Sequence, residues 1–303
     1  MRAAPPSPGA NTPRGLGPPA RPSWVEFEAV GPTVHSPEHD ALRVGRSADV
    51  LSPPIRDGLD EVLVRHGPRD ARGQLGEEGL RNLAGVSSTS VRVAVVVGDL
   101  RMSGLLIREA VSVSLYARYI IGFTEAVRSL ANEFNGWFDK FTGDGFIAFW
   151  IYEAEDDIVR SLPDFCRSIL PASENLIDNL KRNSRNFPVG VGLSIGIDAG
   201  PCELVRVGDA LTVVGSPIVG ATRMVSGARA GQALVNVGLG TAFERQRDRL
   251  ENLGVRLSKH VVPTKEYPEG QEAYEMEFVS TPVRGRSPRK ASERSRNAGR
   301  PTE

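Results

Sequence analysis

Two aspartates are the strongest candidates for chemistry in this sequence. Asp99 follows the apolar run VRVAVVV, and Asp144 stands in the Gly-Asp-Gly turn within WFDKFTGDGFIAFW. Taken alone, an aspartate at a strand end or in a turn usually belongs to the turn itself. If the two strands are neighbours, however, both carboxylates reach the same edge of a sheet. Carboxylate oxygens are hard ligands that suit Mg²⁺ or Mn²⁺ together with a substrate phosphate.

Two basic residues accompany the aspartates. Lys140 lies four positions before Asp144, and Arg223 lies in SPIVGATRMVSGARA. Without further context, these are a solvated strand lysine and an exposed helix arginine. The four histidines are scattered and no Cys/His spacing indicates zinc, so softer metals and a histidine-based centre are disfavoured.

The elements that must position these residues begin at Val91. A buried central strand is predicted over 91–97, because this run is β-branched and apolar. Apolar residues at helical spacing predict one long amphipathic helix over 105–134. A hairpin follows, in which 137–141 pairs with 146–151 around the Gly-Asp-Gly turn.

The remaining elements alternate helices and strands. Acidic residues at 155–157 open a helix that runs to about Leu180 with a break at Pro171. Strands are predicted over 189–200, 210–215, 232–236 and 273–279, and helices over 216–230, capped by Ser216 with Pro217 in its first turn, and 239–249. This order predicts an α+β fold, with a mostly antiparallel sheet flanked by helices in one domain.

Composition divides the 303 residues into four segments. The hydrophobic share of 40% is enough to bury a real core, and the 37 basic residues balance the 37 acidic ones. Half of the 22 prolines precede residue 55, and basic residues gather at the end of the chain. The expected segments are a disordered Pro-rich leader (1–60), a short N-terminal docking segment (61–86), the folded domain (87–279) and a disordered basic tail (280–303).

Several functional classes are disfavoured. The chain has two cysteines, no signal-peptide pattern and no apolar run of membrane-spanning length, so we expect a soluble cytoplasmic protein without disulfides or a membrane span. The basic tail has no interleaved aromatic residues, so a nucleic-acid partner is not expected.

Four segments in this order resemble the class III nucleotidyl cyclases, over roughly residues 91–279. VVVGDLRMSG is similar to the strand that carries the family's first metal-binding aspartate, and VGLSIGIDAGPC is similar to its glycine-punctuated strand pair. KFTGDGFIAFW resembles the motif K-x-x-G-D-x-x-x-A-x-F through Lys140, Gly143, Asp144 and Ala148, with Trp150 in place of the final phenylalanine. LTVVGSPIVGATRM resembles the motif Y-x-x-x-G-x-x-V-N-x-A-x-R-L through Gly215, Ile218, Ala221, Arg223 and Met224.

The resemblance implies a ferredoxin-like, palm-type core and attack of a ribose 3′-hydroxyl on the α-phosphate of a nucleoside triphosphate. By the same resemblance, Asp99, Asp144 and the main-chain carbonyl of Leu100 hold two divalent ions, Mn²⁺ or Mg²⁺. Lys140 reaches the base or a hydrogen-bonded relay to it, Thr212 occupies the second base-contact position, and Arg223 steadies the α-phosphate.

The family's active sites lie between two subunits arranged head to tail, so a single copy of the domain implies a homodimer. The carboxylates of one subunit would face Lys140, Thr212 and Arg223 of the other.

Two departures narrow this expectation. Val219 stands where the family usually has an asparagine, which puts ordinary adenylate cyclase activity in doubt. The text around Asp99, DLRMSGLLIREAVSVSLYARYIIGF, is instead similar to the pyrimidine cyclases of Pycsar antiphage defence. That similarity implies cyclic UMP or cyclic CMP as product, a separate effector that forms no stable complex with the cyclase, and base contacts from Arg101 and from Tyr116 or Tyr119.

Two alternatives stay open. One is a bacterial adenylate cyclase that makes cyclic AMP despite Val219. The other is a catalytically silent module that keeps the fold and binds a nucleotide or a partner. The charged set formed by Asp99, Asp144, Lys140 and Arg223 argues against silence.

Overall fold

The computed structural model describes residues 53–85, 88–264 and 267–279. The expected basic tail and all but the end of the expected leader lie outside these residues. The segment assigned to the leader ends differently, because helix α1 (Pro53–His66) begins at Pro53, before the boundary expected at residue 60. Among the described residues, no helix combines the length and the apolar character that crossing a membrane requires.

One sheet of eight strands organises the described residues. Its order is β2-β3-β1-β4-β6-β8-β7, with β5 paired to the outer part of β4. The strands are β1 (Ser88–Arg101), β2 (Trp137–Phe141), β3 (Phe146–Ile151), β4 (Gly192–Val207), β5 (Ala210–Val214), β6 (Ala233–Asn236), β7 (Val255–Val262) and β8 (Gln271–Phe278). Neighbouring strands are antiparallel except for β4 and β6. The predicted mostly antiparallel α+β fold is therefore confirmed.

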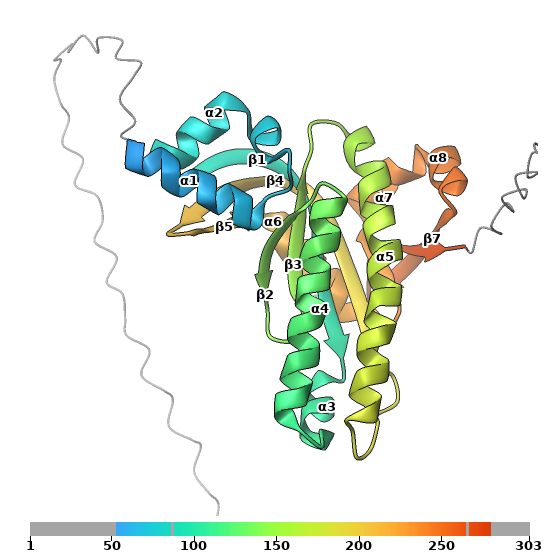
Figure 1. The fold of residues 1–303 in the computed structure, drawn as a ribbon. Coiled ribbons are helices and arrows are strands. Elements are labelled where there is room, and N and C mark those ends of the chain that lie inside the picture. Colours follow the sequence, from blue (N-terminus) through green and yellow to red (C-terminus); the bar gives the residue numbers. More distant parts are fainter. Residues whose placement is uncertain (1–52, 86–87, 265–266, 280–303) are drawn as a thin grey trace, which may run out of the picture. The chain divides into compact units, whose positions relative to one another are not determined.

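Helices cover both faces of this sheet (Figure 1). On one face, α4 (Val113–Glu133) and α5 (Glu155–Arg182) pack over the larger hydrophobic core. The opposite face carries a second core, where α1, α2 (Ala71–Gly85) and α6 (Ser216–Gly227) cover the strands. The remaining helices are α3 (Ser103–Glu109), α7 (Val237–Glu244) and α8 (Arg247–Asn252).

Side-chain alternation along β1 decides where Asp99 points. Val95 and Val97 belong to the core beneath α1, α2 and α6, whereas Val96 and Leu100 belong to the core beneath α4 and α5. Because successive strand residues face opposite sides, Asp99 projects on the same side as Val97. The strand thus delivers a carboxylate to the α6 face of the sheet.

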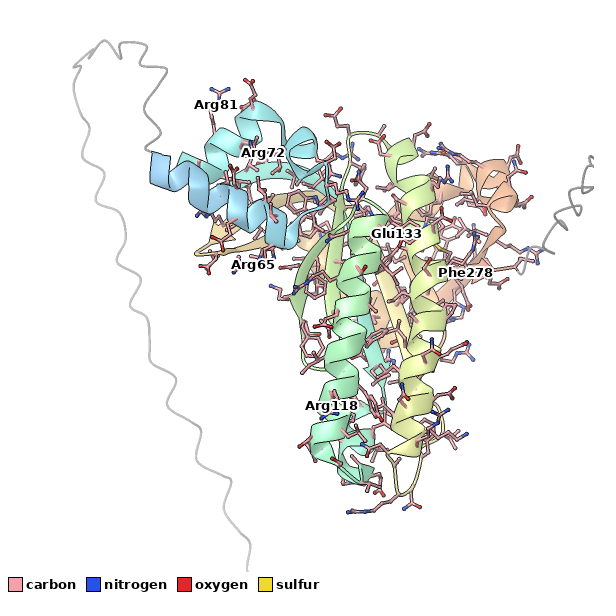
Figure 2. All side chains as sticks on the ribbon, viewed as in Figure 1. Arg65, Arg72, Arg81, Arg118, Glu133 and Phe278 are labelled. Atoms are coloured by element: carbon pink, nitrogen blue, oxygen red, sulfur yellow. The ribbon has the colours of Figure 1, made fainter. Side chains whose placement is uncertain are left out.

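The N-terminal helices form part of this α6 face, although the sequence indicated only a weak docking segment there. Arg65 and Arg72 lie on these two helices (Figure 2). Arg72 of α2 forms an ion pair with Asp60 of α1, and Arg65 of α1 reaches Asp209 in the β4–β5 turn, with 3.5 Å between Nη1 and Oδ2. Leu63 and Leu83 are both buried against the sheet. These helices bury the face beside the site described below.

The single helix predicted over 105–134 is wrong, because the chain forms α3 and α4 with an extended break between them. Ala110 leaves the helix with ψ 133° and makes an isolated bridge to Ser184. Ser112 then caps α4 by accepting a hydrogen bond from the Leu115 amide. The side chain of Asn183 bonds to both main-chain groups of Ser112. Tertiary hydrogen bonds, which periodicity does not reveal, therefore set this boundary.

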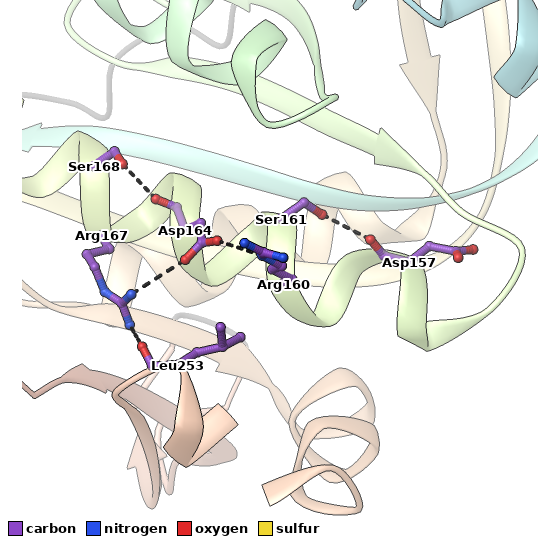
Figure 3. Close-up of polar contacts among 7 residues, drawn as sticks. All are labelled: Asp157, Arg160, Ser161, Asp164, Arg167, Ser168 and Leu253. Carbon is purple, nitrogen blue, oxygen red and sulfur yellow. Dashed lines mark hydrogen bonds and ion pairs between the residues drawn. The ribbon is translucent and has the colours of Figure 1, made fainter. Parts of the chain in front are cut away.

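The break predicted at Pro171 is also wrong, since α5 continues through Pro163 and Pro171 to Arg182. Its N-terminus is as predicted, with acidic residues in the first turn. Figure 3 shows polar contacts along the helix: Asp164 forms ion pairs with Arg160 and Arg167, and Arg167 also donates a hydrogen bond to the carbonyl of Leu253. The prolines have no amide N–H and each costs the helix a hydrogen bond. Burial of one whole face of α5 stabilises the helix by more than this loss.

The remaining differences are smaller. Gly215, not Ser216, is the N-cap of α6. The helix predicted over 239–249 is two short helices, α7 and α8, and strand β7 was not predicted. The hairpin of β2 and β3 has the predicted bounds. Cys166 and Cys202 are free and buried, as expected for a chain without disulfides.

Candidate functional site

Asp99 and Asp144 lie at the ends of neighbouring strands. The β1–β3 ladder ends at the pair Gly98 and Phe146, so Asp99 follows the last pair while Asp144 lies in the adjoining β2–β3 turn. Thr142 closes that turn by donating its amide to the carbonyl of Gly145, at 2.9 Å. A Cβ atom on Gly98 would overlap the Phe146 ring, so any larger residue there would force the ring or the strand to shift. We call Asp99 and Asp144 the carboxylate pair.

The charges of Asp144 and Arg101 both act on Asp99. Burial raises the pKa of Asp99 above its usual value, the charge of Asp144 raises it further, and the charge of Arg101 opposes both. Arg101 lies 3.5 Å from Asp99, measured from Nη1 to Oδ2, and it also donates to the carbonyl of Val225 in α6. The hydroxyl of Ser194 donates to the Asp99 carbonyl at 3.1 Å.

A divalent cation fits this arrangement. A cation placed between two carboxylates offsets the repulsion of their like charges, and carboxylate oxygens are the hard donors that Mg²⁺ and Mn²⁺ prefer. Among the described residues, no group of three or more His, Cys, Asp or Glu side chains is placed to hold a metal. The other ligands would be main-chain, water or substrate oxygens. The Leu100 side chain is a hydrocarbon without ligand atoms, so only its main-chain carbonyl could contribute.

A second polar group lies along β2 and β5. The ammonium of Lys140 donates to the Thr212 hydroxyl at 2.9 Å, and that hydroxyl donates to Oδ2 of Asp139 at 3.1 Å. The same carboxylate oxygen lies 3.6 Å from the Lys140 nitrogen. We call Asp139, Lys140 and Thr212 the lysine triad. The structure thus brings together Lys140 and Thr212, two residues that are predicted to share one function.

Asp139 was missed by the sequence argument. Its side chain is 1% exposed, whereas that of Lys140 is 49% exposed. Burial raises the pKa of Asp139, while the charge of Lys140, the hydrogen bonds from Thr212 and Lys140, and the charge of His66 lower it. The adjacent letters Asp-Lys inside an otherwise aromatic strand were the available signal for a buried acid with its own counter-ion.

A β-bulge explains how consecutive residues of one strand reach the same threonine. Phe138 pairs with Ala148 and Lys140 pairs with Ile147, so Asp139 is an extra residue in the ladder. In a regular strand Asp139 and Lys140 would face opposite sides of the sheet. The bulge removes this alternation and lets both side chains contact Thr212.

Arg223 of α6 acts on a further acidic residue, Asp198. Its charge lowers the pKa of Asp198, a strand β4 residue whose pKa is raised by burial and whose carboxylate accepts a hydrogen bond from the Asn236 side chain. Gly220 allows this approach, because a Cβ there would overlap the Asp198 carboxylate. Val219, at the position where the resemblance expects asparagine, is 49% exposed on α6.

Of the other residues expected to contact the base, Arg101 and Tyr116 lie near the carboxylate pair, not near the lysine triad. Arg101 contacts Asp99, as described. Tyr116 is buried in the core beneath α4, and its pKa is raised by burial and by the charge of Asp144. Tyr119 is partly buried against the same core. Their role at the base remains a prediction.

No protein-family model and no curated protein matches this chain. Solved structures do match. The adenylyl cyclase CyaB from P. aeruginosa superposes with a TM-score of 0.52 and 18% identity, covering 63% of this chain and 95% of that chain. The guanylyl cyclase Cya2 superposes with a TM-score of 0.51 and 15% identity, covering 65% of this chain and 98% of that chain. The fold is that of a class III cyclase catalytic domain.

Proposed function

We propose that this protein is a nucleotidyl cyclase that converts a pyrimidine nucleoside triphosphate, UTP in preference to CTP, to its 3′,5′-cyclic nucleotide. The observation that carries the reaction is the carboxylate pair, which a cyclase-type fold holds at the ends of two neighbouring strands. A separate lysine triad offers hydrogen bonds suited to a base. The proposed preference for a pyrimidine base rests on the similarity of the sequence around Asp99 to that of the Pycsar cyclases.

In this reaction the 3′-oxygen forms a bond to the α-phosphorus, and the bond from that phosphorus to the bridging oxygen of the β-phosphate breaks. The hydroxyl proton leaves to water and pyrophosphate leaves as the second product. Asp99, Asp144 and the Leu100 carbonyl would hold two divalent ions, which when bound lower the pKa of the hydroxyl and neutralise phosphate charge. The carboxylate pair thereby sets the position of the α-phosphate.

The remaining residues bind and orient the substrate. Lys140 and Thr212 would hold the base, and the guanidinium of Arg223 would stabilise charge that develops on the α-phosphate. Val219 has no polar group to add to that stabilisation. The half-exposed Val219 is therefore expected to lower the rate relative to an asparagine at the same position.

We further propose a homodimer with composite sites, in which the carboxylate pair of one subunit faces the lysine triad and Arg223 of the other. Its support is the separation seen in one subunit: Asp144 and Arg101 act on Asp99, whereas the contacts of Lys140 are with Asp139 and Thr212. A mixture of Asp144→Ala and Lys140→Ala proteins tests this arrangement. Each variant is inactive alone, and equal mixing with subunit exchange restores about a quarter of the wild-type rate, because half of the dimers regain one of two sites. A mixture that stays inactive while forming mixed dimers contradicts shared sites.

The product assay tests the reaction and the base together. Purified protein is incubated with Mn²⁺ and each of the four labelled nucleoside triphosphates, and the cyclic products are separated. Asp144→Ala is the negative control, and Asp164→Asn, which changes an ion-paired acid on α5, is the matched positive control. Cyclic UMP as the main product supports the proposal. Cyclic AMP as the main product would support the cyclase reaction but contradict the pyrimidine substrate, since the substrate would then be ATP.

The physiological role proposed with this activity is signal generation in antiphage defence. Cells that carry the gene with its neighbouring effector should resist phage, and Asp144→Ala should abolish that resistance. The silent-module alternative predicts a different result, namely that the purified protein binds a triphosphate without converting any of the four.

A further inference from the structure

We propose that Asp139 is a specificity-determining residue, which fixes the Thr212 hydroxyl as a hydrogen-bond acceptor toward the base and Lys140 as the neighbouring donor. The inference rests on the proposed function in assigning the lysine triad to the base. Neither the sequence argument nor the resemblance assigned a role to Asp139.

The direction of each hydrogen bond follows from the donors available. An ammonium group has only donors, so the Thr212 hydroxyl must accept from Lys140 at 2.9 Å. A hydroxyl has one proton, and the Asp139 carboxylate lies 3.1 Å away on the other side. That proton therefore points at Asp139, and the free side of Thr212 presents a lone pair.

The bulge and burial make this direction fixed. Asp139 is an extra residue in the β2–β3 ladder, so its carboxylate stays beneath Thr212 while Lys140 remains half exposed. Lys140 faces the same carboxylate at 3.6 Å. Burial raises the pKa of Asp139, whereas the charge of Lys140, the hydrogen bonds from Thr212 and Lys140, and the charge of His66 on α1 oppose this rise and favour the ionised acid. An ionised carboxylate can only accept, which leaves Thr212 no alternative orientation.

The consequence is a fixed pattern of one acceptor beside one donor. Such a pattern matches a base edge that offers an N–H next to an acceptor, as uracil does with N3–H and O4. Replacing Asp139 by asparagine introduces an amide that can donate to Thr212. The hydroxyl proton is then free to turn toward the ligand, and edges with two adjacent acceptors, such as O2 and N3 of cytosine, become acceptable.

The experiment compares base selectivity in full-length wild type, Asp139→Asn, Thr212→Val and the double variant. Equilibrium dialysis with each labelled triphosphate gives dissociation constants, and product formation gives kcat/KM. In Asp139→Asn, the ratio between the best and the second-best base should fall about tenfold, the effect of one misdirected buried hydrogen bond. Asp164→Asn should leave this ratio unchanged, and Thr212→Ser, which keeps a hydroxyl, should retain most of it.

The double variant separates positioning from a purely structural role. If Asp139 acts through Thr212, Asp139→Asn changes selectivity by less than about twofold when Thr212 is already valine. Two outcomes overturn the inference: Asp139→Asn keeps the wild-type ratio while Thr212→Val loses it, or the effect of Asp139→Asn persists in the double variant. Thermal unfolding of each variant identifies loss of fold, which would change binding of all four triphosphates alike.

Dialysis also distinguishes failure of the inference from failure of the proposed function. Base-selective binding without any cyclic product would contradict the cyclase reaction, and the binding ratios would still decide the role of Asp139. Binding without preference among the four bases would overturn the inference even if the protein cyclises them.

Discussion

The carboxylate pair and the lysine triad use acidic residues in opposite ways. Asp99 is next to a second carboxylate and is only partly balanced by Arg101, so its negative charge is in excess. Asp139 is buried, yet it has a lysine and a hydroxyl directed at it from its own subunit. The proposed function completes the first group with an added cation, whereas the charges of the second are balanced within the chain. On this proposal, the first group would bind a cation and the second would present a fixed pattern of hydrogen-bonding groups.

The largest expected effect comes from removing one member of the carboxylate pair. Asp144→Ala should lower kcat/KM by about 10³-fold, equivalent to ~4 kcal/mol, because the divalent ions lose a ligand. Initial rates of cyclic nucleotide formation with Mn²⁺ check this, with circular dichroism to confirm folding. A variant that retains more than a tenth of wild-type activity contradicts the assignment of Asp144.

Filling the space at Gly98 should be next in size. Gly98→Ala should destabilise the protein by about 1–3 kcal/mol, because the new methyl group overlaps the Phe146 ring and pushes β1 away from β3. Urea denaturation measures the change in the free energy of unfolding. Gly122→Ala is the control, because a Cβ atom at that helix position meets nothing. Equal stability of the two variants would show that the strands can separate at no cost.

Removing the lysine of the triad should destabilise the fold in a pH-dependent way. Lys140→Met leaves Asp139 buried without its counter-ion, which should cost about 1–3 kcal/mol at pH 7. Lys140 lowers the pKa of Asp139, so in its absence the folded-state pKa rises further above the unfolded value. Stability is then lost as pH rises through that pKa, and the deficit relative to wild type shrinks on acidification. A deficit that is equal at pH 4 and pH 8 contradicts an ionised Asp139.

A substitution in the carboxylate pair should increase stability instead of lowering it, and this change is the smallest of those predicted. Asp99→Asn should stabilise the metal-free protein at pH 7 by less than about 1 kcal/mol, since Asp99 is partly solvated. The pKa of Asp99 is raised, so the wild-type protein loses stability as pH rises through it, and the gain from Asp99→Asn should vanish in acid. Thermal unfolding in EDTA and in Mn²⁺ measures this, and Mn²⁺ should stabilise only the wild type. If Asp99→Asn is less stable than the wild type in EDTA, the negative charge of Asp99 does not destabilise the metal-free protein.

Sequence patterns predicted the parts of the site that depend on local order. The strand that carries Asp99, the hairpin around Asp144 and the helix that carries Arg223 follow from a β-branched run, an Asp-Gly turn and a proline in the first helical turn. The patterns did not predict features set by distant contacts. Asn183 interrupts the long helix at Ser112, and packing carries α5 through Pro171. The role of Asp139 could not be predicted from the sequence, because it depends on a β-bulge and on Thr212 of β5.

Because Asp139 is the extra residue of a bulge, the pairing of β2 with β3 does not depend on it. Both flanking pairs, Phe138 with Ala148 and Lys140 with Ile147, would continue in regular register without it. A chain shortened by this one codon would keep the lysine on the same face and leave the turn that holds Asp144 in place. The hairpin can therefore gain or lose its buried acid in a single insertion or deletion, and the turn that carries Asp144 keeps its place in either case.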